Sequence, residues 1–222
     1  MKDEKEGVKE IEGKKEDFID SNILFVSANQ DKDYSKKLSN ALISCYKIHE
    51  DVSLKCIGGN ACNNAIYAIE KSRPYLESHD SILVTEVIES KIQLKNKNNG
   101  QIMMSKVFSF LPSLIDGKVE DDIFDINKLL KIKGFCNSRE ENRYYIEKLS
   151  NAICSCFLKH DVAFLRYVGV FAGMNAIEAI VLARGEMFKS GINLGFVPRS
   201  VNIRFDKEEK QGLVLEIVSI EK

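Results

Sequence analysis

The 222-residue sequence contains no apolar run approaching the ~18 residues that a membrane-spanning helix needs. Its opening stretch, MKDEKEGVKEIEGKKEDFID, lacks the apolar core of a secretory signal and the acid-poor character of a transit peptide. We therefore expect no membrane association and a cytoplasmic or nuclear location. Because the same stretch mixes both charges with few apolar positions, residues 1–20 are predicted to form a disordered tail.

The chain also lacks an excess of positive charge. Its 32 Lys and Arg residues are balanced by 33 Asp and Glu residues, which gives a formal net charge of −1. No global positive field can then draw the protein onto nucleic acid or an anionic membrane. Any binding to nucleic acid must come from a local patch.

Sequence signatures of metal and nucleotide sites are missing too. None of the six cysteines forms a C-x-x-C pair, and most lie in apolar stretches, so we expect buried free thiols. Gly58-Gly59 belongs to neither a P-loop nor a G-x-G-x-x-G fingerprint. These glycines could hold a phosphate at a helix N-terminus or allow close packing of helix and strand. Neither a metal nor a nucleotide cofactor is predicted.

No pairing of a nucleophile with a base can be recognised. His49 and His160 each follow a predicted helix, which favours a structural role at the helix C-terminus, where a cation is stabilised. Glu86 and Glu89 have no acidic counterparts in the second half of the chain. We therefore predict that the protein is not an enzyme.

What the sequence does contain is an internal repeat. The line LSNALISCYKIHEDVSLKCIGGNACNNAI starts at Leu38, and LSNAICSCFLKHDVAFLRYVGVFAGMNAI starts 111 positions later, at Leu149. The offset holds without a gap through Gly58 and Gly169, Arg73 and Arg184, and the shared Asn-Ala-Ile at 64–66 and 175–177. We infer a duplication of one unit.

Each copy predicts the order strand, helix, strand, helix, strand, strand. In the first copy, the apolar stretch 23–27 predicts a strand, helical spacing follows at 38–45, and residues 52–56 alternate as a strand should. A second helix covers 61–69, and strands at 81–88 and 101–110 flank the turn KNKNNG in a long hairpin. The first strand of the second copy is expected at 131–135. The class is α+β in two layers, with domains at 21–110 and 131–222 and a connector at 111–130.

The second copy resembles the stage V sporulation protein S family, small single-domain relatives of the Alba nucleic-acid-binding proteins. The resemblance lies in VGVFAGMNAI, LARGEMFKSGINLGFVP and DKEEKQGLVLEIV, and its positions include Gly169, Ala172, Ala183-Arg184-Gly185, Ser190-Gly191, Pro198 and Glu208-Glu209. The first copy departs more, with Pro74 in place of Gly185 and Val87 in place of Pro198. Because Alba-type domains commonly associate in pairs, the resemblance implies two Alba-like βαβαββ domains packed as a pseudo-dimer. The chain would be a monomer or a higher homo-oligomer through these domains.

The two predicted hairpins differ in charge. Between Ser90 and Ser105 the first carries Lys91, Lys95 and Lys97 and no acidic residue, with Asn98 among the amides at its tip. Such an arm suits contact with phosphates and the minor groove, and the Alba resemblance implies this use. A solvated Lys/Asn-rich turn is the alternative interpretation.

The second hairpin carries Arg199 and Arg204, but its tip, DKEEK, is acidic in part. Its cations are therefore opposed by carboxylates close by. The candidate nucleic-acid-binding residues of the whole chain are Lys91, Lys95, Lys97, Asn98, Arg199 and Arg204.

Together these features predict a non-enzymatic protein that binds RNA, or DNA and RNA without specificity, mainly through the first copy. The competing hypothesis is a scaffold or protein-interaction module that kept the fold without binding nucleic acid. The near-zero net charge favours that alternative.

Overall fold

The computed structural model describes residues 22–31, 33–95, 100–117, 128–134, 136–205 and 208–220. The tail at 1–20, for which disorder is expected, lies outside these ranges. So do the tip of the first hairpin at 96–99 and half of the connector, at 118–127.

The described residues form two units of similar order. The first unit consists of β1 (Ile23–Val26), α1 (Tyr34–His49), β2 (Ser53–Cys56), α2 (Gly59–Leu76), β3 (Ser81–Lys95) and β4 (Ile102–Asp116). The second consists of β5 (Leu129–Lys131), α3 (Arg139–His160), β6 (Ala163–Tyr167), α4 (Val170–Phe188), β7 (Leu194–Phe205) and β8 (Glu208–Ser219).

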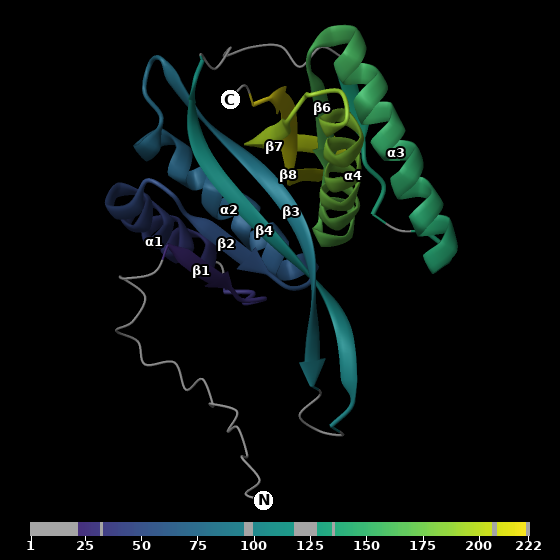
Figure 1. Cartoon of the computed structure of the whole chain (residues 1–222), viewed down its shortest axis with the longest axis horizontal. Helices are drawn as coiled ribbons and strands as arrows, with labels where there is room; N and C mark the ends of the chain where they lie inside the picture. The colour runs from purple at the N-terminus through teal and green to yellow at the C-terminus, as the bar shows by residue number, and fades with distance from the viewer. Residues whose placement is uncertain are drawn as a thin grey trace, which may run out of the picture.

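The eight strands of the described residues join one sheet in the order β1-β2-β4-β3-β7-β8-β6-β5. The first strand of each unit pairs in parallel with the second, and the other pairings are antiparallel. In β2, Leu54 and Cys56 are fully buried while Ser53 and Lys55 are not, as expected for a strand with one face against helices. Figure 1 shows the first unit, with α1 and α2, beside the second unit, with α3 and α4. The α+β class is confirmed.

The two units meet about a pseudo-two-fold axis. Strands β3 and β7 pair antiparallel at Thr85 and Phe196, and Phe196 lies 111 positions after Thr85. Each residue is thus the repeat counterpart of the residue it faces, which is what a two-fold axis through this pair requires. The predicted packing of the units as a pseudo-dimer is confirmed.

Close packing of α2 against α4 explains why Gly59, the second glycine of the Gly58-Gly59 pair, has no side chain. A Cβ atom at Gly59 would lie 2.7 Å from Val170 Cγ1 and 2.8 Å from Met174 Cγ, so the start of α2 fits against α4 only without a side chain. The preceding Gly58 has φ of 81°, and its counterpart Gly169 has φ of 82°. These are conformations that favour glycine. The glycines therefore serve the entry into each helix and the contact between the two units.

The sheet side of the interface is equally tight. The rings of Phe110 and Phe196, one from each unit, meet edge to face with centroids 6.2 Å apart, and both are fully buried. A Cβ atom at Gly195 would lie 2.6 Å from Val84 of the first unit. Apolar packing therefore continues from one unit into the other.

Two equivalent arginines cross between the units. Arg73 on α2 donates from Nη1 to the carbonyl oxygen of Pro198 at 3.0 Å. Its repeat counterpart, Arg184 on α4, forms an ion pair with Glu86 of β3. The Arg-to-Arg match seen in the repeat register therefore reflects a shared role at the interface.

Three strands differ from the expected boundaries. Strand β3 runs past the expected end at position 88 to Lys95. Strand β4 continues beyond position 110 to Asp116, because β3 begins at Ser81 and pairs with β4 along its whole length. Strand β5 lies at Leu129–Lys131, mostly before the expected 131–135, and so takes up the end of the expected connector. Leu130, opposite Leu165 of β6, packs against the core there, which explains this position. Residue 135 lies outside the described ranges.

The cysteines are free thiols in the described structure. Cys45, Cys56 and Cys62 are buried as expected, whereas Cys136, Cys154 and Cys156 are partly exposed. The hydrogen bond with Cys62, together with burial, raises the pKa of the Cys56 thiol far above its ordinary value. Among the described helices, none is long and apolar enough to cross a membrane.

Thr85 offers a test of the packing at the pseudo-two-fold axis. Its hydroxyl is fully buried and has no hydrogen-bond partner among the described residues. Because an unsatisfied buried hydroxyl is unfavourable, Thr85→Val should raise the free energy of unfolding by about 1 kcal/mol. Chemical denaturation followed by circular dichroism measures this change.

Ser72 supplies the matched control for Thr85. It is equally buried, but its hydroxyl bonds to the carbonyl oxygen of Ala68 at 2.7 Å and to Ser39 Oγ at 2.9 Å. Ser72→Ala should therefore lower the free energy of unfolding by about 1 kcal/mol. A loss of stability in Thr85→Val would contradict the unsatisfied state of that hydroxyl.

Candidate nucleic-acid interface

The long hairpin of β3 and β4 projects from the body as an arm (Figure 1). The two strands pair continuously from Ser81 and Asp116 at the base to Lys95 and Ile102 near the tip. This ladder of backbone hydrogen bonds fixes which side chains share a face of the ribbon. The arm is therefore an ordered platform along its described length.

The lysines of the arm lie on one face of the ribbon. Lys91 and Lys95 alternate with Ile92 and Leu94, so both lysines point to the same side. Lys106 stands opposite Lys91 in the antiparallel register, which places it on that side as well. Lys91 and Lys95 are exposed, whereas Lys97 and Asn98 lie outside the described residues. The structure thus brings two of the predicted lysines together and adds Lys106.

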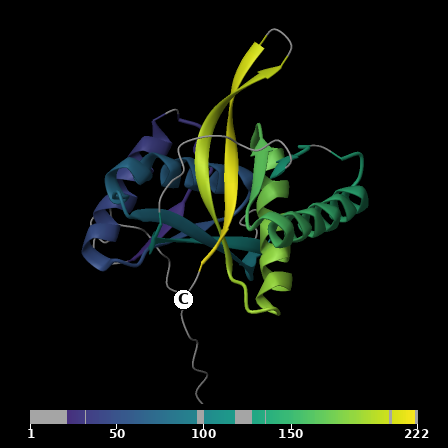
Figure 2. The same cartoon turned by 90° about the horizontal axis from the view of Figure 1, so that it is seen from above.

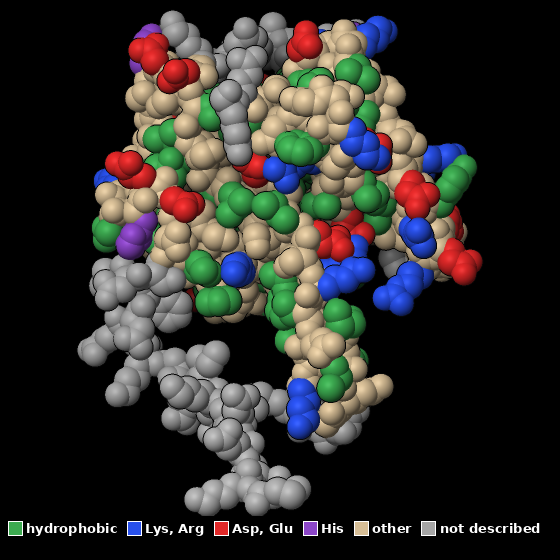
Figure 3. All heavy atoms as spheres, in the orientation of Figure 1, with side chains coloured by type: hydrophobic (Ala, Val, Ile, Leu, Met, Phe, Trp, Pro, Cys, Tyr) green, Lys and Arg blue, Asp and Glu red, His purple; other side chains and the backbone are tan. Residues whose placement is uncertain are grey.

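Exposed apolar side chains accompany these lysines. Ile102 is 62% exposed and Met104 60% exposed, and the register places both on the lysine face. Met103 and Leu94 are exposed on the opposite face. Figure 3 shows blue and green side chains along the described part of the arm. We did not predict that apolar side chains would be exposed beside the lysines, although the sequence QIMM next to the lysine-rich turn was the available signal.

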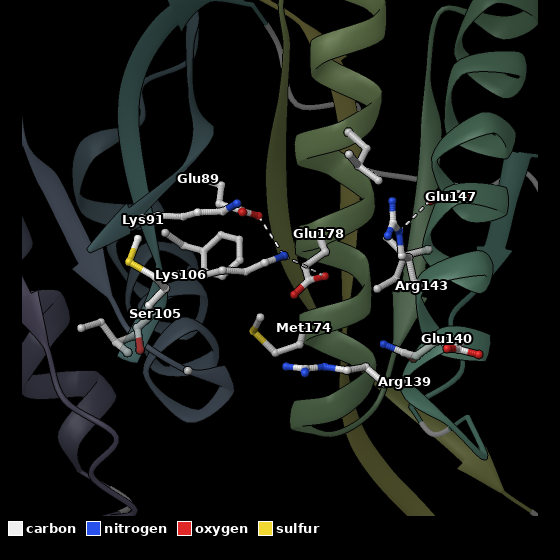
Figure 4. Close-up of a pocket in the computed structure, with 17 residues that line it drawn as sticks. Glu89, Lys91, Ser105, Lys106, Arg139, Glu140, Arg143, Glu147, Met174 and Glu178 are labelled. Carbon is white, nitrogen blue, oxygen red and sulfur yellow. Dashed lines mark hydrogen bonds and ion pairs between the residues drawn. The ribbon is translucent and has the colours of Figure 1, made fainter. Parts of the chain in front are cut away.

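An open cleft of about 1130 Å³ lies at the base of the arm, between β3 and β4 on one side and α3 and α4 on the other (Figure 4). Lys106 crosses it, with its Nζ 3.1 Å from Glu89 Oε2 and 3.3 Å from Glu178 Oε2. Burial lowers the pKa of Lys106, but the bonds and charges of Glu89 and Glu178 outweigh it and place the pKa above the ordinary value. Lys106 therefore stays charged at neutral pH and ties the arm to the second unit.

The positive and negative charges that line the cleft are equal in number. Four cations and four carboxylates line it: Lys91, Lys106, Arg139, Arg143, Glu89, Glu140, Glu147 and Glu178. Arg143 pairs with Glu147 at 3.2 Å, and Lys106 is shared by two carboxylates. The cleft is thus a neutral surface, which Lys91 borders, and Lys95 is the described lysine of the arm that lies beyond it.

The arginines of the second hairpin are differently placed. Arg199 donates from Nη2 to Glu216 Oε2 at 2.6 Å, and both side chains are 19% exposed, so its guanidinium is already paired. Arg204 is exposed but stands opposite Glu209 in the register of β7 and β8. Figure 2 shows this hairpin projecting from the body in the turned view. Its cations lie beside carboxylates, as Lys106 of the first arm does, whereas no ion pair of Lys91 or Lys95 is seen among the described residues.

The histidines lie at helix ends, and the described residues form no metal-binding cluster. His49 and His160 occupy the last turns of α1 and α3, as expected. Within the described ranges, no three His, Cys, Asp or Glu side chains lie close enough together to hold a metal ion.

Two paired βαβαββ units, each with a projecting hairpin, define a small α+β protein duplicated in tandem. The family model described as stage V sporulation protein S (SpoVS) matches residues 22–107 and again residues 143–220. The chain therefore belongs to the stage V sporulation protein S family and contains two copies of its unit. A comparison with curated proteins gives no match.

Proposed function

We propose that the protein binds nucleic acid, RNA or DNA without strong sequence preference, through the arm of β3 and β4. One observation carries this proposal: the ordered ribbon presents Lys91 and Lys95 on one exposed face, with no acidic residue between Ser90 and Ser105. Lysines in such an array neutralise successive phosphates and release their counterions. The local patch that a chain of near-zero net charge requires is thus present.

The apolar residues of the arm support the same function. Proteins that enter the minor groove commonly combine cations with apolar side chains, such as Ile and Met, that insert between base steps. Ile102 and Met104 occupy this position relative to the lysines. They offer shape and contact area but no donor or acceptor pattern on their side chains, which favours binding with little sequence preference. The resemblance to Alba proteins, which use the corresponding hairpin, points in the same direction.

Binding of labelled oligonucleotides by fluorescence anisotropy tests the proposal. Single- and double-stranded DNA and RNA should all bind at low salt, because phosphate contacts are shared by all four. If Lys91, Lys95 and Lys97 each contact one phosphate, the affinity should fall about 20- to 40-fold between 50 and 200 mM salt. Absence of binding at low salt would contradict the function.

The neutral cleft favours a second candidate function, a protein-interaction module. Mixed charges around an apolar floor that includes Ile146 and Met174 are typical of protein contacts rather than phosphate sites. A heparin column separates the two candidates. Retention that collapses with moderate salt favours nucleic-acid binding, and flow-through at low salt favours the interaction module.

A further inference from the structure

The base of the first arm carries a lysine whose charge is already paired. Lys106 shares the lysine face of the ribbon with Lys91 and Lys95, and its side chain is 43% exposed. Its Nζ atom lies 3.1 Å from Glu89 Oε2 and 3.3 Å from Glu178 Oε2. Lys106 is thus accessible from solvent, but two carboxylates hold its ammonium group.

The two carboxylates come from different units. Glu89 lies on β3, a strand of the arm itself, whereas Glu178 lies on α4 of the second unit. Figure 4 shows both side chains directed toward the Lys106 ammonium, which lies between them. Glu89 is 21% exposed and Glu178 25% exposed, so the surrounding protein limits their movement. We refer to Lys106, Glu89 and Glu178 as the Lys106 cluster.

The second unit has uncharged residues at the positions of this cluster. By the offset of 111 residues and the pairing of β7 with β8, the counterparts of Lys91, Glu89, Lys106 and Glu178 are Asn202, Ser200, Gln211 and Tyr67. Within the two copies, these carboxylates therefore accompany the arm that carries the lysines.

The Lys106 cluster has a charge of −1, because one ammonium faces two carboxylates. A phosphate oxygen that accepts a hydrogen bond from Lys106 Nζ lies about 3 Å from the ammonium and at most about 6 Å from each carboxylate oxygen. Coulomb energy falls as the inverse of distance, so the repulsion from two carboxylates is then at least as large as the attraction to one ammonium. The paired lysine gives a phosphate no net attraction.

We propose that Glu89 and Glu178 keep Lys106 from contacting phosphates and so limit how far the nucleic-acid-binding surface extends toward the cleft. This inference rests on the proposed function and names the residues that restrict it. Nucleic acid bound to Lys91 and Lys95 then ends at the Lys106 cluster. The equal numbers of positive and negative charges around the cleft fit this limit.

The double variant Glu89→Gln/Glu178→Gln tests the proposal by fluorescence anisotropy with the same labelled oligonucleotides. Glutamine has nearly the shape of glutamate but no charge, so Lys106 becomes available to a phosphate. One added contact should raise the affinity about 5- to 8-fold at 100 mM salt and steepen the slope of log K against log salt by about 0.7 to 0.9. Addition of Lys106→Ala to this variant should abolish the gain.

Glu140→Gln/Glu147→Gln is the matched control. It removes two carboxylates from the α3 side of the same cleft, and neither of them is paired with Lys106. Since solvent and salt screen these more distant charges, the affinity should change less than about 2-fold. Equal gains in the two double variants would overturn the proposal, because the effect would then come from the overall charge of the cleft.

Acetylation of lysines in the wild type, with and without a saturating oligonucleotide, provides a readout that needs no variant. Nucleic acid should protect Lys91 and Lys95 and leave the modification of Lys106 unchanged. Protection of Lys106 together with them would overturn the proposal. Arm-dependent binding by the wild type with no gain in Glu89→Gln/Glu178→Gln would overturn this inference alone, whereas absence of binding by the wild type would overturn the proposed function as well.

Discussion

Replacement of Lys91, Lys95 and Lys97 together by alanine should reduce the affinity for every nucleic acid tested by more than 10-fold at low salt. Each lost phosphate contact removes a counterion-release contribution with a slope of about 0.7 to 0.9 in log K against log salt. The slope should therefore decrease by up to about 2 to 3. Anisotropy titrations at several salt concentrations measure both quantities.

Two controls separate the arm from the overall charge. The variant Lys36→Ala/Lys47→Ala/Lys159→Ala removes the same number of positive charges from exposed positions on α1 and α3 and should bind almost like the wild type. Glu208→Gln/Glu209→Gln should weaken nothing, because these carboxylates repel a phosphate backbone. Equal binding by the arm variant and the wild type would contradict the assignment of the arm.

Phe196→Ala should lower the free energy of unfolding by about 3 to 5 kcal/mol. The ring is fully buried at the pseudo-two-fold axis and meets Phe110 of the other unit edge to face. Its removal leaves a cavity between the units, so both units should lose stability in one transition. Urea denaturation followed by circular dichroism and by tyrosine fluorescence measures the effect.

Phe188→Ala is the matched control, because the same residue type is 65% exposed there. We expect a change within about 0.5 kcal/mol for this variant. A double-mutant cycle of Phe196 with Phe110 should give a coupling of about 0.5 to 1.5 kcal/mol. Two separate transitions in the wild type would show that the units unfold independently and would contradict the shared core.

The internal repeat was the feature of the sequence that predicted most about the fold. The offset of 111 residues predicted two units, and the family resemblance implied their pairing. The structure places residues at this offset opposite each other at Thr85 and Phe196. Such symmetry is visible in sequence because equivalent residues occupy equivalent environments. The extension of β4 to Asp116 was not predicted, because residues 111–130 were assigned to a connector.

Properties that depend on long-range contacts could not be predicted in the same way. The pairing of Arg199 with Glu216 joins residues on neighbouring strands, and only the register of β7 and β8 brings them together. Lys106 likewise meets Glu178 from the other unit. Charge counts along a segment therefore identified the positive arm but not which cations are already paired.

Photochemical crosslinking of the wild-type protein to a labelled oligonucleotide, followed by mass spectrometry of the peptides, tests the central claim most directly. It reports where nucleic acid lies without any substitution. Crosslinks should lie within residues 90–106, which make up the first arm including its tip. Crosslinks confined to the hairpin of β7 and β8 or to the helices, or no crosslinks at low salt, would contradict that claim.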